Sequence, residues 1–473
     1  MLFSSTVFLF LFLPVVLVVY YILPRTFKNT WLLGASLAFY AWGEPEFLPI
    51  MLFSIAINYV FAIIVDKKRE SKTAVRWILA VAVISNLMLL GYFKYAGFIV
   101  ENMNSLFGTD YANPNVPLPL GISFYTFQAI SYVIDVYRRD GGVQKNPINM
   151  ALYKSLFPQL IAGPIVRYQT VSDQIKDRKE TFEKFAYGTK RFIIGLGKKM
   201  FLANNCGWVA DQVFAQNPDE ISMGLAWIGI IAYSLQIYFD FSGYSDMAIG
   251  LGKMFGFDFL ENFNYPYISR SVAEFWRRWH ISLGTWFRDY LYIPLGGSRV
   301  SEWKVYRNLA AVWFATGIWH GASWTFIAWG VYYGVFIMLE RAFLGKLLKK
   351  WPVFVQHIYA LLVVIAGWVF FRAETFTYAI GYYKAMLGLN GAGIWSADAG
   401  YYFTQYGILI LLAIIGATPL LVTINKSVLD KRPTLYTQAA WDIGKTGYYL
   451  LVMAIGIVSV VANTFNPFIY FRF

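Results

Sequence analysis

The chain has 473 residues, of which 58% are hydrophobic and only 14% are charged, and its mean hydropathy is +0.48. Soluble domains carry about 25% charged residues, so this composition excludes an ordinary soluble enzyme and indicates a membrane protein. The net charge is +13, but the basic residues fall between apolar runs, as orientation in a bilayer requires. We therefore expect membrane lipids around the protein and no nucleic-acid partner.

Apolar runs close to the length of a membrane span follow one another along the chain. They cover residues 6–24, 30–42, 48–65, 77–98, 118–137, 188–204, 222–239, 308–340, 353–371, 403–424 and 445–463. A span needs about 20 apolar residues, so the pattern predicts an all-helical polytopic membrane protein. The first run lacks a basic start and a small-residue cleavage site, and it is therefore interpreted as a span rather than a signal peptide.

Three stretches depart from a simple span. Residues 156–165, LFPQLIAGPI, are apolar but short, which favours a re-entrant segment. Residues 263–299 alternate aromatic and basic side chains, which predicts interfacial or buried helices with Phe275, Trp279 and Trp286 near one side. The long run 308–340 is interrupted by HGAS, where two segments are expected to meet.

The basic segments predict the orientation of the chain. Residues 66–76, 137–145, 176–191, 341–350 and 424–433 are rich in lysine and arginine and should be cytoplasmic. With few basic residues in the loops near 99–116 and 386–401, both termini are expected to be extracytoplasmic. We expect one integral-membrane domain over 1–473, with N-terminal spans (1–137), a core (138–340), and C-terminal spans and tail (341–473).

Several familiar sites are missing from the sequence. GLGKK (195–199) and GLGKM (250–254) lack the frame and hydroxyl of a phosphate-binding loop, and their glycines instead favour close helix packing. SGYSDM (242–247) is not a hydrolase nucleophile elbow. The three histidines have no zinc spacing, so neither a metal nor a bound redox cofactor is expected. The single cysteine, Cys206, is typical of a small buried thiol.

Ionisable residues in apolar segments are costly in lipid and indicate candidate functional sites. Asp240 and Asp246 lie in YFDFSGYSDMAIG and either pair with an arginine at a helix junction or take part in function. His280 lies in a basic, aromatic run and is either a packing residue or a functional one. His357, at the edge of a span, is expected to be structural.

His320 is the strongest candidate from the residues alone. An imidazole has its ordinary pKa near physiological pH, and burial favours its neutral form. A neutral base in a dry site takes a proton from an attacking hydroxyl. The small residues of GIWHGAS on either side leave room for a substrate, although a proton relay or a structural hydrogen bond also fits this pattern.

Five longer segments together resemble the membrane-bound O-acyltransferase family. They are FYTFQAISYVIDVYR (124–138), QLIAGPIVRY (159–168), YFDFSGYSDMAIGLG (238–252), EFWRRWHISLGTWFRDYLYIPLGGSR (274–299) and WHGASWTFIAWG (319–330). The likeness covers nearly the whole chain, and the motifs occur in order. The IPLGGSR continuation favours the branch of bacterial polysaccharide O-acetyltransferases, including the alginate acetylation proteins, over the more distant D-alanyl transfer proteins of teichoic acid modification.

The resemblance implies a ring of about 10–12 spans, with re-entrant and interfacial helices, around a central funnel. The family's two active-site histidines correspond to His320, as general base deep in the funnel, and to His280. Supporting roles are considered for Trp319, Asp240, Asp246, Arg277, Arg288, Asp289 and Tyr470. Arg277, Arg278 and Arg288 either balance a negatively charged donor or, as we prefer, pair with Glu274 and Asp289. Tyr470 would contact a partner or relay a proton.

The resemblance also implies the substrates and the location. The acyl donor would be a cytosolic thioester, acetyl-CoA or a carrier-bound acyl group, and the acceptor an extracytoplasmic polysaccharide. An extracytoplasmic partner acyltransferase of the SGNH type would complete the transfer. The protein would lie in the bacterial cytoplasmic (inner) membrane.

Three other interpretations remain open at this point. D-alanyl transfer would use the same fold. An ion-coupled transporter or flippase would use Asp240, Asp246 and His320 as a relay, although the repeated halves of many transporters are not visible in the sequence. A non-catalytic scaffold would recruit extracytoplasmic enzymes and would tolerate His320→Ala.

Overall fold

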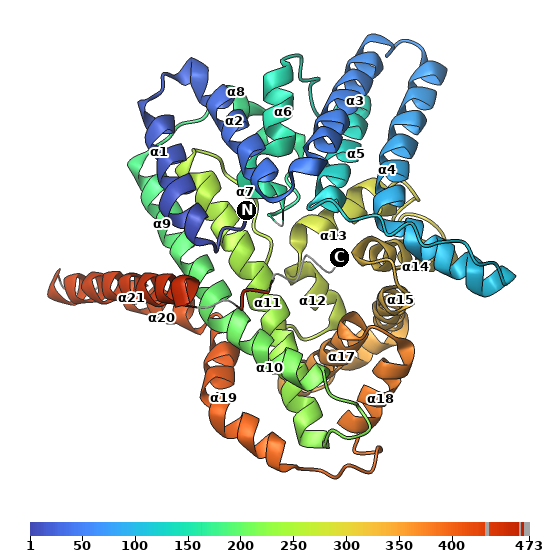
Figure 1. Ribbon diagram of the computed structural model, residues 1–473, viewed down its shortest axis with the longest axis vertical. Coiled ribbons are helices and arrows are strands. Elements are labelled where there is room, and N and C mark those ends of the chain that lie inside the picture. Colours follow the sequence, from blue (N-terminus) through green and yellow to red (C-terminus); the bar gives the residue numbers. More distant parts are fainter. Residues whose placement is uncertain (162, 431–434, 463–464, 468–473) are drawn as a thin grey trace. The chain divides into compact units, whose positions relative to one another are not determined.

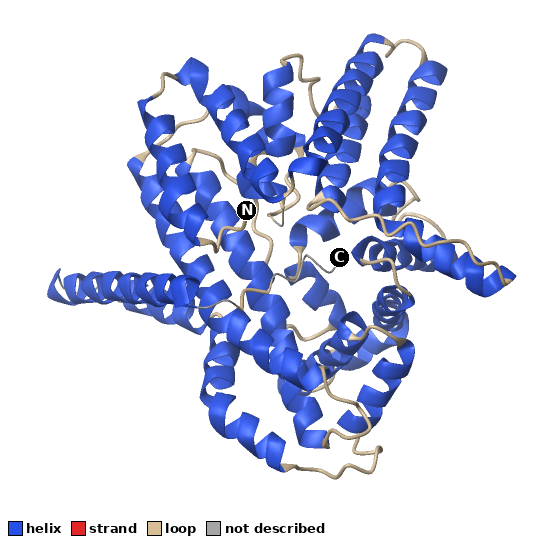
Figure 2. Cartoon of the chain, viewed as in Figure 1, coloured by secondary structure: helices blue, strands red, loops and turns tan. Residues whose placement is uncertain are grey.

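The computed structural model describes residues 1–473 except 162, 431–434, 463–464 and 468–473. The described backbone contains helices and loops and no strand, which confirms the all-helical prediction (Figure 2). The chain divides into two compact units, Met1–Phe192 with Ser245–Leu260 and Ile193–Tyr244 with Glu261–Phe473. These limits differ from those of the three expected parts, and the single 1–473 domain stays a prediction.

The first unit is built from the N-terminal helices (Figure 1). Its helices are η1 (Phe8–Phe12), α1 (Leu13–Ile22), α2 (Arg25–Gly43), η2 (Pro45–Phe47), α3 (Leu48–Lys67), α4 (Lys72–Phe107), α5 (Ile122–Arg138), α6 (Pro147–Ser155), α7 (Phe157–Leu160), α8 (Tyr168–Lys176) and most of α9 (Phe182–Gly197). α3, α4 and α5 pack against one another, and α2 packs on α6. Tyr40, Met51, Leu90 and Tyr125 form part of their shared apolar core.

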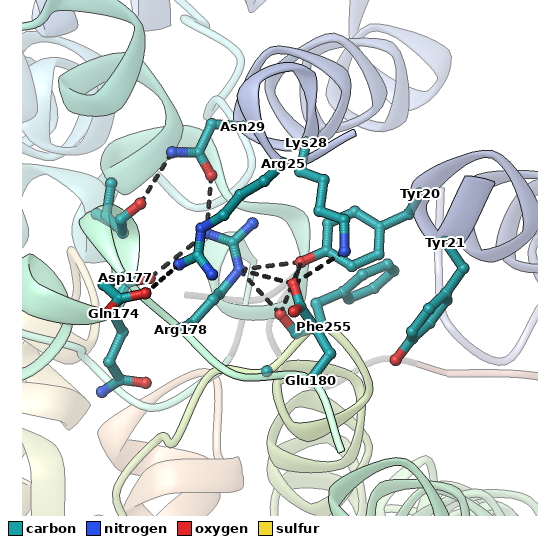
Figure 3. Close-up of polar contacts among 12 residues, drawn as sticks. Tyr20, Tyr21, Arg25, Lys28, Asn29, Gln174, Asp177, Arg178, Glu180 and Phe255 are labelled. Atoms are coloured by element: carbon teal, nitrogen blue, oxygen red, sulfur yellow. Dashed lines mark hydrogen bonds and ion pairs between the residues drawn. The ribbon is translucent and has the colours of Figure 1, made fainter. Parts of the chain in front are cut away.

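A buried arginine holds the loop between α8 and α9 inside this unit (Figure 3). Arg178 Nε donates hydrogen bonds to the Tyr20 hydroxyl and to the Phe255 carbonyl, both at 3.0 Å. Tyr20 and Lys28 contact the Glu180 carboxylate. Burial raises the pKa of Glu180, but the hydrogen bonds from Tyr20 and from its own backbone N–H, together with Lys28, outweigh burial and leave the pKa below its ordinary value. The cluster anchors the chain just beyond the end of α11.

The second unit carries both candidate histidines. Its helices are η3 (Lys198–Ala203), α10 (Asn204–Phe214), most of α11 (Met223–Met254), η4 (Pro266–Ile268), α12 (Val272–Arg278), α13 (Ile281–Phe287), η5 (Arg288–Tyr292), α14 (Glu302–His320), α15 (Trp324–Leu339), η6 (Glu340–Leu344), α16 (Gly345–Leu348), α17 (Val353–Arg372), α18 (Phe376–Met386), α19 (Ala397–Gly416), α20 (Leu420–Asp430) and α21 (Leu435–Ala462). α15 packs against α14, α12 and α17. These contacts bring the end of α14, which carries His320, close to the segment after α12, which carries His280.

Seven helices among the described residues are long and apolar enough to cross a membrane. They are Pro45–Lys67, Lys72–Phe107, Met223–Met254, Trp324–Leu348, Val353–Arg372, Ala397–Gly416 and Tyr436–Ala462. Four other predicted runs are not among these helices, so the expected count of about 10–12 spans stays a prediction. The helix Phe8–Ile22 is short, α5 has 17 residues that are mostly buried, and the runs 30–42 and 188–204 lie in α2 and in α9 with η3. The described helices thus confirm a polytopic membrane protein.

The predicted break in the 308–340 run and the predicted buried helices of 263–299 are present, whereas a re-entrant path of residues 156–165 stays a prediction. The 308–340 run divides into α14 and α15 at HGAS, as expected. Within 156–165, α7 has only four residues and is buried, so it is too short to span. In 263–299, Phe275, Trp279 and Trp286 are all buried on or beside the short helices α12 and α13.

Glycines allow α9 and α11 to approach closely at two points. In the first unit, a Cβ on Gly250 would lie 2.6 Å from the Gly188 carbonyl oxygen. In the second unit, a Cβ on Gly243 would lie 2.8 Å from the Gly195 carbonyl oxygen. The prediction that the glycines of 195–199 and 250–254 serve helix packing is confirmed.

Candidate active site

His320 is the last residue of α14, and a glycine follows it where the helix ends. Gly321 adopts an extended conformation, and a Cβ at this position would collide with the Phe326 ring. A residue with a Cβ would therefore displace the Phe326 ring or α15. The predicted break at HGAS thus places His320 at the end of α14, next to the start of α15.

A close crossing of α14 and α15 sets the position of His320 further. A Cβ on Gly317, one turn before His320, would lie 2.6 Å from the Phe326 carbonyl oxygen and 3.3 Å from the Gly330 Cα. Gly330 in turn lies against the backbone of Trp313. Small residues let two helix backbones approach in this way, so the imidazole is held by backbone contact rather than by a flexible side chain.

Aromatic rings enclose the His320 imidazole. Ring centroids lie 4.8 Å away for Trp329, 5.0 Å for Trp319 and 5.3 Å for Phe371, all with a near-perpendicular orientation. Only 6% of His320 is exposed. Edge-to-face packing of this kind fixes a ring orientation and excludes bulk water.

His280 lies between α12 and α13 and is also buried. Its backbone is left-handed, with φ 45° and ψ 53°, and only 2% of the residue is exposed. The ring packs on Phe241 of α11, at 4.6 Å between centroids. Trp319 lies 6.2 Å from the His280 ring and 5.0 Å from the His320 ring. One tryptophan is thus in contact distance of both histidines.

Burial determines the protonation state of His280. It lowers the pKa of the imidazole from 6.5 to about 3, because the charged form loses its hydration inside the protein. His280 is therefore neutral at physiological pH and is available as a hydrogen-bonding group or base.

Glu340 is a positioning residue that the sequence argument did not select. Its carboxylate accepts hydrogen bonds from the backbone N–H groups of Val272 (2.6 Å) and Ala273 (3.0 Å) at the start of α12. Ser271 accepts from the Glu274 N–H at 3.0 Å and completes the cap. An acidic residue at the end of an apolar run was a usable signal for Glu340.

Asn262 is a second residue that the sequence did not reveal. Its side-chain oxygen lies 3.1 Å from His280 Nδ1 and accepts a hydrogen bond from the Ser282 N–H at 3.2 Å. Its backbone oxygen accepts from the Ile281 N–H at 3.0 Å. An asparagine in a loop 18 residues before the histidine gives no local signal, because only the fold brings the two together.

The amino-acid sequence matches one family of known proteins. The sequence model of the membrane-bound O-acyltransferase family matches residues 142–379, which include both buried histidines. The chain is 42% identical to a probable alginate O-acetylase, AlgI, of Azotobacter vinelandii, with 100% of both chains covered. The chain belongs to the membrane-bound O-acyltransferase family.

Two further relatives show the breadth of this similarity. A peptidoglycan O-acetyltransferase of Helicobacter pylori is 36% identical, with 100% of this chain and 98% of the relative covered. A teichoic acid D-alanyltransferase of Bacillus subtilis is 30% identical over 49% of this chain and 60% of the relative. The protein is thus a multi-pass membrane acyltransferase, and an enzyme of this family requires an acyl donor.

The two α11 aspartates of this acyltransferase have separate basic partners. Asp240 is 2.7 Å from Lys199 Nζ, and both side chains are almost completely buried. Asp246, in the first unit, is 2.6 Å from an Arg191 guanidinium nitrogen. The expectation of an arginine partner is confirmed for Asp246, and Asp240 pairs with a lysine.

The arginine pairs of the 274–289 segment follow the structural interpretation. Arg278 is 2.9 Å from Glu274, and Arg288 is 2.6 Å from Asp289. Arg277 lies in the last turn of α12. Tyr470 lies outside the described residues. A role of these residues in catalysis stays a prediction.

The remaining titratable candidates fall outside this site. His357 Nδ1 is 3.1 Å from the Ser269 carbonyl oxygen, as fits a structural role. Cys206 is buried, which confirms the expectation for its thiol, and burial raises the pKa of that thiol to about 12. Among the described residues, no group of three or more His, Cys, Asp or Glu is arranged to hold a metal ion.

Proposed function

We propose that the protein is an O-acetyltransferase that passes an acetyl group from a cytosolic thioester across the membrane to O-acetylate an extracytoplasmic polysaccharide. The similarity to an alginate O-acetylase and to a peptidoglycan O-acetyltransferase, each over the full chain, supports polysaccharide O-acetylation. The D-alanyltransferase matches only about half of the chain, so acetyl transfer is the better supported reaction. Acetyl-CoA is the proposed donor.

The observation that carries this proposal is the pair of buried histidines beside Trp319. The chain has only three histidines, and two of them lie against the same indole ring. A buried imidazole in an aromatic enclosure suits proton transfer from a hydroxyl, because bulk water is kept out. This is the chemistry that ester formation requires.

In the proposed step, His320 takes the proton of the acceptor hydroxyl as its oxygen attacks the thioester carbonyl. A C–O bond forms, the C–S bond breaks, and the proton passes from His320 to the leaving thiolate. His280 is proposed to orient the acceptor beside Trp319. The site is proposed to lie at the end of a funnel that admits the donor from the cytoplasm.

The proposed setting is the bacterial cytoplasmic membrane, with both termini extracytoplasmic. The basic loops between the apolar runs support this orientation. A separate extracytoplasmic acyltransferase of the SGNH type is the proposed partner that completes transfer to the polymer. Tyr470 is proposed to lie on the partner's side of the membrane.

The ion pairs of α11 weaken the transporter alternative. A relay through Asp240, Asp246 and His320 needs carboxylates that exchange protons. Asp240 instead forms a buried pair with Lys199, and Asp246 pairs with Arg191. Breaking a buried pair costs several kcal/mol, about 3–5 in typical cases, so these carboxylates are better suited to holding helices.

Polymer-bound acetate released from the cell surface tests the proposal. Wild type, His320→Ala, His357→Ala and a full deletion are compared at matched protein levels in the membrane. We expect His320→Ala to match the deletion and His357→Ala to match wild type, because His320, unlike His357, lies in the aromatic enclosure. The His357 variant controls for loss of a histidine elsewhere in the same unit.

Other outcomes of this experiment identify the alternatives. Unchanged acetate in the deletion contradicts polysaccharide acetylation, and D-alanine esters would then be measured. Loss of acetate in the deletion but not in His320→Ala indicates a scaffold and contradicts the proposed base. Dependence on an acyl carrier protein rather than coenzyme A would favour D-alanyl transfer.

A further inference from the structure

The orientation of the Asn262 amide is fixed by a neighbouring backbone group. The Ser282 N–H donates to the Asn262 side chain at 3.2 Å, and the Ser282 hydroxyl donates to the same atom at 2.9 Å. A backbone N–H can only donate, so the atom facing it must be the amide oxygen Oδ1 and not the nitrogen. The asparagine therefore cannot be turned around without losing this bond.

The same oxygen determines which nitrogen of His280 carries the proton. Oδ1 lies 3.1 Å from His280 Nδ1. An oxygen with no hydrogen can only accept, so Nδ1 must carry the hydrogen of this bond. A neutral imidazole has one N–H, and Nε2 therefore carries the lone pair.

The Ser282 hydroxyl does not reverse this assignment. Its oxygen is 3.4 Å from His280 Nδ1 but 2.9 Å from Asn262 Oδ1. The shorter contact takes the hydroxyl proton, and the serine oxygen is left as a second acceptor for the Nδ1 hydrogen. Both oxygens near Nδ1 thus favour the same tautomer.

Backbone hydrogen bonds join residues 262–264 to residues 278–281, the segment that contains His280. The Asn262 carbonyl oxygen accepts from the Ile281 N–H at 3.0 Å, and the Asn264 N–H donates to the Arg278 carbonyl at 2.9 Å. These bonds lie on both sides of the left-handed His280 backbone. The imidazole and its amide partner are therefore held at a fixed distance rather than meeting by chance.

We propose that Asn262 is a positioning residue that holds His280 with its proton on Nδ1, so that Nε2 accepts a hydrogen bond from the acceptor hydroxyl. This inference rests on the proposed function for the identity of the acceptor. It also selects between two roles of His280, because a neutral Nε2 without hydrogen orients a hydroxyl but cannot donate to the oxyanion that forms at the thioester carbonyl.

Nitrogen NMR of ¹⁵N-histidine-labelled protein in lipid bilayers measures the tautomer directly. The chain has three histidines, so His280→Gln, His320→Gln and His357→Gln assign the signals by their loss. We expect wild-type His280 to be protonated on Nδ1 and not on Nε2. A proton on Nε2 overturns the proposal. This reading does not depend on any acetyl transfer.

Three variants test whether Asn262 causes this state. Asn262→Leu keeps the volume but removes the acceptor, and we expect a loss of the fixed tautomer and a decrease in surface acetate. Asn262→Asp keeps an acceptor and should keep Nδ1 protonated. Ser282→Ala keeps the backbone N–H and should leave the tautomer unchanged.

The outcomes separate this inference from the proposed function. A wild-type tautomer or wild-type acetate in Asn262→Leu overturns the role of Asn262, as does a tautomer change in Ser282→Ala. If the full deletion retains surface acetate, the acetylation proposal fails. The NMR spectrum still decides independently whether His280 carries its proton on Nδ1.

Discussion

At the scale of single residues, His280 combines an unfavourable backbone with a buried ring. A left-handed conformation in a residue with a Cβ costs about 1–3 kcal/mol and persists only where the surroundings enforce it. Here the hydrogen bonds from the Ile281 and Ser282 N–H groups to Asn262 enforce it. Such strain at a buried imidazole is typical of a functional position rather than of packing alone.

The buried state of His280 predicts how stability depends on pH. The pKa of His280 is about 3 in the folded protein, compared with an ordinary value of 6.5 for an exposed histidine. Between these two values the unfolded chain therefore binds more protons than the folded protein. Stability should therefore fall as the pH is lowered below about 6.5 toward 3. His280→Gln cannot titrate and should lose less stability over the same window.

The apparent melting temperature of the detergent-solubilised protein, measured from neutral pH to about pH 5, tests this expectation. Each variant is compared with its own value at neutral pH, so that a general effect of the substitution cancels. Equal pH dependence in wild type and His280→Gln would show that His280 does not contribute.

At the scale of elements, short helices hold the site because other helices support them. α12 has seven residues, too few to be stable alone. Glu340 caps its first turn, and Trp276 packs on Trp313 and Tyr333 at 5.0 and 4.8 Å between centroids. The position of His280 thus depends on α14 and α15, the helices that also position His320.

The α14–α15 crossing gives an element-scale prediction. Gly317→Ala would place a methyl group 2.6 Å from the Phe326 carbonyl oxygen, so the two helices must separate. We expect a lower melting temperature and a loss of surface acetate, because His320 moves with α14. The measurements are thermal unfolding in detergent and acetate release.

Gly91→Ala is the matched control for this substitution. Gly91 lies within helix α4, and a Cβ there would meet nothing within 4 Å. Alanine favours a helix over glycine by about 1 kcal/mol, so Gly91→Ala should be neutral or slightly stabilising. If both variants behave alike, close approach at Gly317 is not the cause of the effect.

At the scale of the whole molecule, the orientation of the chain decides which side supplies the donor. α4 has 36 residues and is long and apolar enough to cross the membrane. Exposed acidic residues lie in the loops at its two ends, Glu70 before it and Asp110 after it. If α4 spans, these two positions must lie on opposite sides.

Cysteine labelling tests this orientation without a cysteine-free background. Cys206 is buried and burial raises its pKa to about 12, so it should not react with a maleimide in folded protein. In spheroplasts, an impermeant maleimide should label Asp110→Cys, and it should label Glu70→Cys only after permeabilisation. The reverse pattern would contradict extracytoplasmic termini, and labelling of both would contradict a spanning α4.

The sequence by itself determined the class of protein and the residues worth testing. The low share of charged residues and the runs of about 20 apolar residues indicate a membrane protein, because lipid solvates such segments and water does not. A histidine such as His320 is conspicuous in an apolar run since its burial is costly, and Gly321 marks the helix break beside it. These are local properties, and the periodicity and composition of one segment suffice to reveal them.

Only the tertiary structure decided which side chains meet. Asn262 and His280 are 18 residues apart, and Glu340 reaches Val272 from 68 residues away. Asp240 pairs with Lys199, which comes from the η3 segment before α10. Such pairs depend on how helices cross, which is set by packing over the whole unit and leaves no trace in the local pattern of either segment.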